Sequence, residues 1–510
     1  NGNGQIKAYA IHLSEDGKNW GPPILKGELE IRLANEQPIL FPEKTTKRFI
    51  KFLVTDAHSL DGRSLASIGK LDVLTSLPMN NSTSRITVSS SSPDDLKKVI
   101  KGFAERAFSS SLSEDELAPY YSVSLNSLRE RGDFVQATKV GLKAILCSHR
   151  FLIAPGEHAN RSYSKAAHLS RILWLSVPDE KLLDLSQTDK LSAETIPDQI
   201  DRMLKDEKSR RLIHSFCDQW LNLRSFEKVT PSLKLYPKYN DLLNHYLPIE
   251  TEAYLDHLIK ENLPVGHLID SDFSILNQRL AQHYGIEGVI GQRMRKVSFN
   301  PEVPRGGLLT MGSVLKVTAD GFDTSPILRG AWISKNVVGN TLSPPPENVK
   351  AIEPEHGKEV ATLREQIEEH KNNKACYACH KSIDPYGFAL ESFDATGQWR
   401  TKYRVKNPHG GTFQYRPQGY YDLAGKVDAS GEIGKVEFAD IFGLKKILLS
   451  NHKKIAYNFI KKFFEYANGY KPNLRQRLHL FAMIPENARE CRMKDLITKT
   501  LVYSLTGAQE

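Results

Sequence analysis

Two cysteines and a histidine form the one local pattern in the chain whose spacing dictates a particular covalent chemistry. They read Cys376-x-x-Cys379-His380 in a sequence of 510 residues. Two thiols at this spacing, near the start of a helix, can add across the two vinyl groups of a haem, and the adjoining imidazole then becomes an axial ligand of the iron. The pattern therefore predicts one covalent haem c with His380 as an iron ligand.

The same Cys-x-x-Cys spacing also occurs in thioredoxin-like redox sites and in halves of zinc sites. A zinc site needs a second ligand pair, and Cys147, Cys217 and Cys491 each stand alone. A thioredoxin motif opens a helix within a βαβ pattern, whereas the flanks here are helical or polar. The spacing favours haem attachment, with zinc or a dithiol as the alternative, and any pairing among the three lone cysteines stays open.

The residues after the motif predict how the haem ligand is held. Asp384-Pro385 is expected to end the attachment helix, because proline lacks the amide hydrogen that a helix interior uses. Pro385 is also expected to set the backbone carbonyl that accepts a hydrogen bond from the second ring nitrogen of His380, since metal-bound histidines commonly have such a partner.

Four further side chains are candidates for haem contact. Phe388 is expected to pack against the macrocycle, and Trp399 and Arg400 are expected to hydrogen-bond a propionate. Arg329 is another propionate candidate. For each of the four, core packing or a surface salt bridge is the alternative.

The ligand at the sixth coordination position of the iron would distinguish the functional classes. Methionine would give a high-potential electron carrier, histidine would lower the potential, and an open position would admit peroxide or substrate. No methionine lies between His380 and Met483, so the usual downstream ligand is missing. Met311 is therefore the leading candidate, with His370 and His409 as alternatives.

Length and composition describe a soluble globular protein of several domains. Hydrophobic residues make up 40% and charged residues 25% of the chain. No apolar run approaches the roughly 20 residues of a membrane span. The formal net charge is +9, and the basic residues are interspersed with acidic ones. This pattern favours a solvated basic surface over nucleic-acid binding and keeps an acidic redox partner or polyanionic glycan as alternatives.

Because haem is attached to such motifs outside the cytoplasm, we expect a periplasmic or secreted protein whose signal peptide was removed before residue 1.

The first 76 residues show strand patterns and turn chemistry. Residues 6–13 and 48–55 carry short alternating and apolar runs, and Asp16-Gly17 supplies a turn, so a β-sandwich is predicted. Three stretches resemble the later strands of a discoidin-like (factor 5/8 type C) domain, and they are Tyr9-Ala-Ile-His-Leu-Ser-Glu-Asp-Gly-Lys-Asn-Trp20, Lys47-Arg-Phe-Ile-Lys-Phe52 and Ala66-Ser-Ile-Gly-Lys-Leu-Asp-Val73. The resemblance covers half of that fold and implies glycan or surface binding. We therefore expect a second polypeptide to complete the sandwich.

A helical period follows the polar linker 77–94. Leu96, Val99, Ile100 and Phe103 recur at spacings of three and four, and the pattern continues through a helical scaffold. Near the end of the chain, Phe459, Ile460, Phe463 and Phe464 form an apolar stripe that Asn468-Gly469 terminates, which predicts a second helical region.

Motifs in these regions resemble a family of large haem-bearing proteins abundant in Planctomycetes. The resemblance spans about 400 residues and rests on Arg171-Ile-Leu-Trp174, Phe216-Cys-Asp-Gln-Trp-Leu221, Leu276-Asn-Gln-Arg-Leu-Ala-Gln-His-Tyr284, Arg305-Gly-Gly-Leu-Leu309, Thr324-Ser-Pro-Ile-Leu-Arg-Gly-Ala-Trp332, Ile383-Asp-Pro-Tyr-Gly-Phe388 and Phe464-Glu-Tyr-Ala-Asn-Gly469. Proteins of this family combine a helical scaffold, a cytochrome-like segment and a C-terminal helical domain, all of unknown function. The resemblance identifies a family and leaves the activity open.

The sequence thus predicts a mainly α, multi-domain helical protein with a c-type haem segment and an N-terminal partial β-sandwich. The expected segments are a partial sandwich (1–76), a linker (77–94), a helical scaffold (95–300), a haem domain (301–410) and a β-ribbon with C-terminal helices (411–510). The leading function is electron transfer with a redox partner protein, or the haem domain of an oxidoreductase acting near carbohydrate. The alternatives are a surface- or glycan-binding protein that haem stabilises, and a peroxidase-like enzyme.

Overall fold

The computed structural model describes residues 5–29, 39, 41, 47, 49–58, 91–108, 112–152, 161–341, 364, 367, 374–406 and 421–507. The chain forms two compact units, Asn1–Thr87 and Val88–Glu510. The boundary between them falls within residues 77–94.

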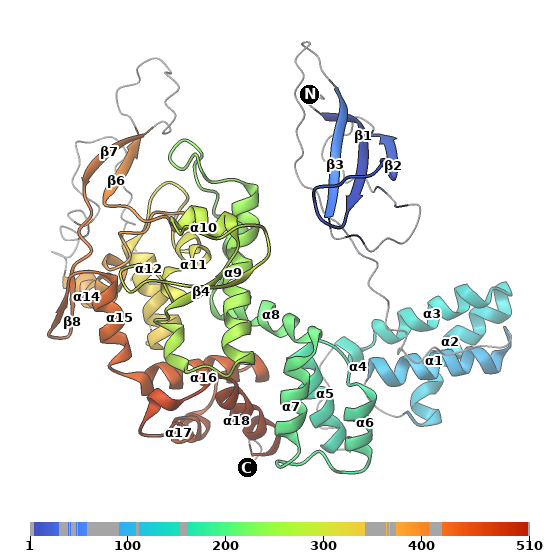
Figure 1. Cartoon of the computed structure of the whole chain (residues 1–510). Helices are drawn as coiled ribbons and strands as arrows, with labels where there is room; N and C mark the ends of the chain where they lie inside the picture. The colour runs from blue at the N-terminus through green and yellow to red at the C-terminus, as the bar shows by residue number, and fades with distance from the viewer. Residues whose placement is uncertain are drawn as a thin grey trace. The chain divides into compact units, whose positions relative to one another are not determined.

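An antiparallel sheet of three strands makes up the described part of the first unit (Figure 1). The strands are β1 (Gln5–Ser14), β2 (Leu25–Glu28) and β3 (Phe49–His58), in the order β2-β1-β3. The strands expected at 6–13 and 48–55 are therefore confirmed. Tyr9 is buried, and its ring stacks on Phe52 with centroids 5.3 Å apart. Residues 66–73 lie outside the described part of the chain, so the half-sandwich and its completion by a second polypeptide stay predictions.

The second unit begins with three packed helices. They are α1 (Pro93–Ala107), α2 (Glu114–Arg131) and α3 (Phe134–Leu146), and the short α4 (His149–Leu152) follows. The expected stripe on α1 is confirmed, since Leu96 and Ile100 are buried and Phe103 packs partly buried beside them. Ser92 caps this helix by accepting the amide of Asp95, and Pro93 takes the first helical position, where its missing amide hydrogen costs nothing.

The scaffold continues with mostly helical elements. They are α5 (Arg161–Trp174), α6 (Glu180–Gln187), α7 (Ile196–Lys205), η1 (Glu207–Ser209), α8 (Arg210–Trp220), η2 (Leu223–Lys228), α9 (Asp241–Lys260), η3 (Val265–Leu268), β4 (Phe273–Leu276), α10 (Gln278–Tyr284) and β5 (Arg295–Ser298). Strands β4 and β5 pair antiparallel.

The segment around the motif and the C-terminal region follow. The former comprises η4 (Leu308–Thr310), α11 (Gly312–Val317), α12 (Pro326–Trp332), the π-helical η5 (Ile333–Val338), α14 (Lys374–Phe388), β6 (Lys402–Lys406) and β7 (Tyr421–Lys426). The latter comprises β8 (Gly431–Ile433), β9 (Val436–Phe438), α15 (Ile441–Leu449), α16 (His452–Asn468), α17 (Leu474–Ala482), η6 (Ala488–Glu490) and α18 (Met493–Thr506). Strands β6 and β7 form one ribbon, and β8 and β9 form another.

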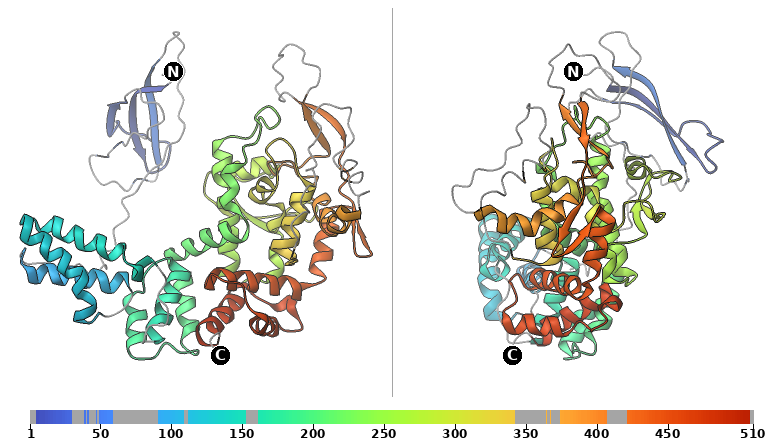
Figure 2. Two further views of the ribbon diagram at one scale, coloured as in Figure 1. Left: turned by 180° about the vertical axis from the view of Figure 1, so that it is seen from behind. Right: turned by 90° about the vertical axis from the view of Figure 1, so that its left-hand side faces the viewer.

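One hydrophobic core joins the scaffold to the C-terminal helices, which lie side by side in all three views (Figures 1 and 2). The ring of Phe216 on α8 lies 5.1 Å from Trp220, 6.2 Å from Phe459 and 5.4 Å from Phe463. Such aromatic pairs contribute about 0.5–1.5 kcal/mol each beyond the area they bury. The segment with the motif adds Trp332 to this core, so these regions of the chain stabilise one another.

The predicted mainly α fold class is confirmed. The stripe on α16 is confirmed as well, because Phe459, Ile460, Phe463 and Phe464 are all buried and Gly469 ends the helix with a φ of 74°. Among the described residues, no helix combines the length and apolar character needed to cross a membrane.

Candidate functional site

Helix α14 carries the Cys376-x-x-Cys379-His380 motif. The backbone of both cysteines is helical, so the two residues lie within one turn near the start of the helix, while their side chains lie outside the described part of the structure. His380 is the first residue of the motif whose side chain is described. The motif thus lies near the start of a helix, as the sequence predicted.

A buried carboxylate holds the imidazole of His380. The Nδ1 atom lies 3.0 and 3.1 Å from the two carboxylate oxygens of Asp384, one helical turn further on. Asp384 is fully buried, and the His380 side chain is 13% exposed. An Nδ1–H that donates to this carboxylate leaves the ring in the tautomer whose lone pair is on Nε2, the atom that coordinates a metal in such a pair. The ring orientation and tautomer therefore fit an iron ligand.

The expected end of the attachment helix at Asp384-Pro385 is wrong. Helix α14 continues through Pro385 to Phe388, and the carbonyl of Pro385 accepts the amide of Ala389 at 3.3 Å. Because the helix continues, Asp384 lies four residues after His380 on the same helix face, and its carboxylate can reach the ring. The described partner of the His380 Nδ1 atom is thus the side chain of Asp384, and not the backbone carbonyl that was expected through Pro385. The His-x-x-x-Asp spacing was the sequence signal for this pair.

Two glycines let α14 lie directly against α12. A Cβ atom at Gly387 would lie 1.8 Å from the carbonyl oxygen of Pro326, and one at Gly330 would lie 2.0 Å from that of Ile383. Real Cβ contacts are never this close, so the two backbones touch only because both positions lack a side chain. This contact fixes the position of the helix that carries His380.

Phe388 lies at the buried end of the same helix. Its side chain is 3% exposed, and the guanidinium of Arg364 lies 4.0 Å from the ring centroid. Arg364 also pairs with Asp428 at 3.2 Å and donates to the carbonyl of Ser430. Phe388 thus lies eight residues after His380 on the same helix, and its contact with a haem stays a prediction.

Arg329 and Arg400 share one buried carboxylate. Arg329 donates to Glu391 at 3.1 Å, and Arg400 donates to the other carboxylate oxygen at 3.1 Å. Thr324 donates to Glu391 at 2.7 Å and accepts from Arg400 at 2.8 Å. Burial lowers the pKa of Arg329 to about 10, against the opposing effect of Glu391, so the guanidinium is charged at neutral pH. Both arginines that were predicted to bind a propionate thus have a protein carboxylate as partner.

Arg329 also anchors the turn after α14. It donates to the backbone carbonyls of Leu390 and Phe393 at 2.7 and 2.8 Å and to that of Asp394 at 3.0 Å. Trp399, in the same turn, packs edge-on against Phe393 at 5.1 Å and is 39% exposed. Arg329 therefore orders the chain directly after the motif helix.

Met311 lies in the core at the start of α11 and is 2% exposed. The other candidates for the sixth position, His370 and His409, lie outside the described residues. The sixth ligand therefore stays a prediction.

A buried acid is connected through Tyr284 to Gly312, the residue after Met311. The carboxylate of Glu250 accepts from the hydroxyl of Tyr284 at 2.5 Å and from that of Ser274 at 2.8 Å. The hydroxyl of Tyr284 in turn accepts the amide of Gly312 at 3.0 Å, and the guanidinium of Arg305 lies 3.7 Å from the Tyr284 ring. Burial raises the pKa of Glu250 from 4.5 to about 7, and its hydrogen bonds and Arg305 oppose that rise. Nothing in the sequence pattern singled out this acid.

The described side chains include no group of three His, Cys, Asp or Glu residues that could hold a metal ion. Cys147, Cys217 and Cys491 are all free thiols, the first exposed and the other two buried. No disulfide therefore joins these three cysteines.

Two segments of the chain match known families. Residues 161–286 match the family described as PSD4, a protein of unknown function (DUF1592), and residues 305–403 match that described as PSCyt3, a protein of unknown function (DUF1588). These are domains of the planctomycete-type proteins that the sequence resembles, so the resemblance is confirmed for these two segments. The second match contains the motif together with Arg329, Trp399 and Arg400. Neither a curated protein nor a solved structure matches the chain.

Proposed function

We propose that the chain carries one haem c bound to Cys376 and Cys379, with His380 as an iron ligand, and that it exchanges electrons with a partner protein outside the cytoplasm. The observation that carries the proposal is the hydrogen bond between His380 and the buried Asp384, on the same helix as the two cysteines. A haem at this site would supply a one-electron Fe(III)/Fe(II) couple.

Different residues of the chain hold the His380 ring, the helix that carries it and the segment that follows this helix. Asp384 fixes the tautomer and rotation of the His380 ring, because its carboxylate accepts the Nδ1 proton. Gly330 and Gly387 fix the helix itself against α12. The buried Arg329–Glu391–Arg400 cluster orders the chain directly after that helix. The helix that carries His380 is therefore held in place by its contact with α12 and by the segment that follows it.

The test of covalent attachment uses the full chain, exported in a host that matures c-type cytochromes. The wild-type protein is expected to keep its pigment after denaturation, whereas the Cys376→Ser/Cys379→Ser double variant is expected to lose it, because no thioether can form. Haem staining of a denaturing gel and the pyridine haemochrome spectrum measure the outcome. The variant Cys147→Ser is the matched control, since it removes an exposed free thiol and leaves the motif intact. A colourless wild-type protein, or pigment that survives in the double variant, would contradict the proposal.

Asp384→Asn is expected to raise the midpoint potential of the haem protein by about 60 mV, the shift that corresponds to a tenfold change in a one-electron equilibrium. The carboxylate makes the imidazole a stronger donor and so stabilises Fe(III), and the neutral amide removes that effect. Spectroelectrochemical titration of both proteins measures the shift. Covalent haem is expected to remain in the variant, because both thiols are present.

Glu432→Gln is the control for this change, because it removes the same charge from an exposed side chain on β8, a strand that packs against α14. Its potential is expected to stay close to that of the wild type. Equal shifts in the two variants would mean that net charge, and not the bond to His380, sets the potential.

A second candidate function, peroxide reduction, is favoured by the same carboxylate. A histidine made more basic by a buried acid favours Fe(III), the resting state from which haem proteins react with peroxide. Addition of hydrogen peroxide with a reducing dye separates the two functions. Dye oxidation that depends on Asp384 supports the enzyme, and an inert iron that still exchanges electrons supports the carrier.

A further inference from the structure

The C-terminal region holds most of the net positive charge of the chain. Residues 438–507 contain thirteen Lys and Arg residues against five Asp and Glu residues, a net charge of +8 compared with +9 for the whole sequence. A field of one sign on one part of a protein attracts partners of the opposite sign and speeds their association.

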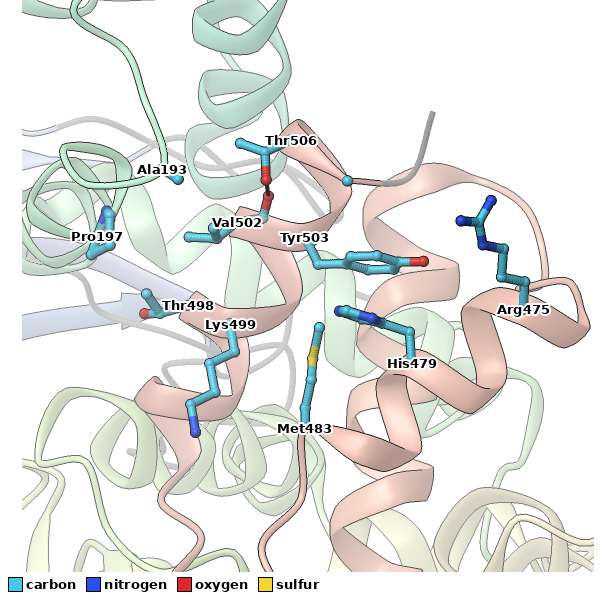
Figure 3. Close-up of a pocket in the computed structure, with 11 residues that line it drawn as sticks. Ala193, Pro197, Arg475, His479, Met483, Thr498, Lys499, Val502, Tyr503 and Thr506 are labelled. Atoms are coloured by element: carbon cyan, nitrogen blue, oxygen red, sulfur yellow. Dashed lines mark hydrogen bonds between the residues drawn. The ribbon is translucent and has the colours of Figure 1, made fainter. Parts of the chain in front are cut away.

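A groove opens in this region between α17 and α18, beside the start of α7. Its volume is about 580 Å³, and Figure 3 shows Arg475 to one side and Lys499 to the other side of the stacked rings of His479 and Tyr503. The two ring centroids lie 3.9 Å apart with an angle of 16° between the planes. No acidic side chain is among the described residues that line the groove, so its charged groups are all basic.

An apolar ridge lies on α17, the helix that supplies Arg475 and His479 to the groove. Leu474, Leu478 and Phe481 follow one another at spacings of four and three residues, so they share one face of the helix. Their exposed fractions are 65%, 63% and 44%. Single exposed apolar residues are ordinary, but an aligned row on a helix that also lines a basic groove is typical of a contact surface for another protein.

We infer that the groove and the α17 ridge bind an acidic protein segment, whose apolar side chains contact Leu474 and Leu478 and whose carboxylates contact Lys499. Charge complementarity favours an acidic partner, because the described residues that line the groove include cations and no acid. The ridge favours a protein over a sulfated glycan, because a polysaccharide has no aliphatic side chains to cover exposed leucines. The inference does not depend on bound haem.

The test uses the full chain and a short fluorescein-labelled helical peptide, with leucines three and four residues apart on one face and glutamates on both flanks. Fluorescence anisotropy is expected to show saturable binding that weakens as salt is raised. Lys499→Glu and Leu478→Ser are each expected to weaken binding about tenfold, since both side chains are exposed and neither change disturbs the core.

Lys139→Glu on α3 is the matched control, because it makes the same charge reversal at an exposed site on a separate helix. It is expected to bind the peptide as the wild type does. Absence of binding, or equal weakening by Lys139→Glu and Lys499→Glu, would overturn the inference. So would competition by dextran sulfate together with full affinity in Leu478→Ser, because that result identifies a site for polyanions in general.

Discussion

Replacing Arg329 by Met is expected to lower the free energy of unfolding of the second unit by about 3–5 kcal/mol. The guanidinium is fully buried and bonds to Glu391 and to three backbone carbonyls. Methionine has a similar length and no donor, so the variant leaves a buried carboxylate oxygen and three carbonyls without this partner. Urea unfolding followed by tryptophan fluorescence measures the loss, because the buried Trp332 lies on the same helix as Arg329.

Two variants separate the buried network from a general effect of charge. Lys335→Met also replaces a cation by Met, at an exposed position close by in η5, and is expected to change stability by about 0.5 kcal/mol or less. Arg329→Lys is expected to fall between these values, because an ammonium group cannot reach all four acceptors of a planar guanidinium. A loss below about 1 kcal/mol in Arg329→Met would show that Arg400 alone satisfies Glu391.

The sequence was sufficient for those parts of the fold that local periodicity determines. The stripes on α1 and α16 follow from apolar residues three and four positions apart, and Asn468-Gly469 marks a helix end because glycine adopts a positive φ without strain. The strands of the first unit follow in the same way from alternation. Each of these signals lies within one element, so no knowledge of tertiary contacts was needed.

The tertiary contacts that hold the candidate site could not be predicted from local patterns, because the residues that form them are distant in sequence. Arg329 meets Glu391 across 62 positions, and its pattern on α12 is equally compatible with a surface residue. The close approach of Gly330 and Gly387 depends on how two helices pack, which neither helix shows by itself. The pairing of His380 with Asp384 is local, since the two residues are four positions apart on one helix. A helix that ended at Asp384-Pro385 would not have implied this pairing.

Stability is expected to fall by about 3 kcal/mol between pH 4.5 and pH 8 on account of Glu250 alone. Its pKa of about 7 in the folded protein lies above the value of 4.5 for an unperturbed glutamate. The folded state therefore binds this proton more tightly than the unfolded state. The stabilisation is complete below pH 4.5 and is lost as the pH rises through 7, where the buried carboxyl group must ionise among Tyr284, Ser274 and Arg305.

The substitution Glu250→Gln isolates this effect, because an amide does not titrate in this range. Urea unfolding of both proteins at several pH values gives the difference between their free energies of unfolding, in which the other titrating groups cancel. That difference is expected to shift in favour of the variant by about 3 kcal/mol from pH 4.5 to pH 8. Glu261→Gln, at the exposed end of the same helix, is the control and should not reproduce the shift. A constant difference across the range would mean that Glu250 remains ionised throughout, with Arg305 and the two hydroxyl groups outweighing its burial.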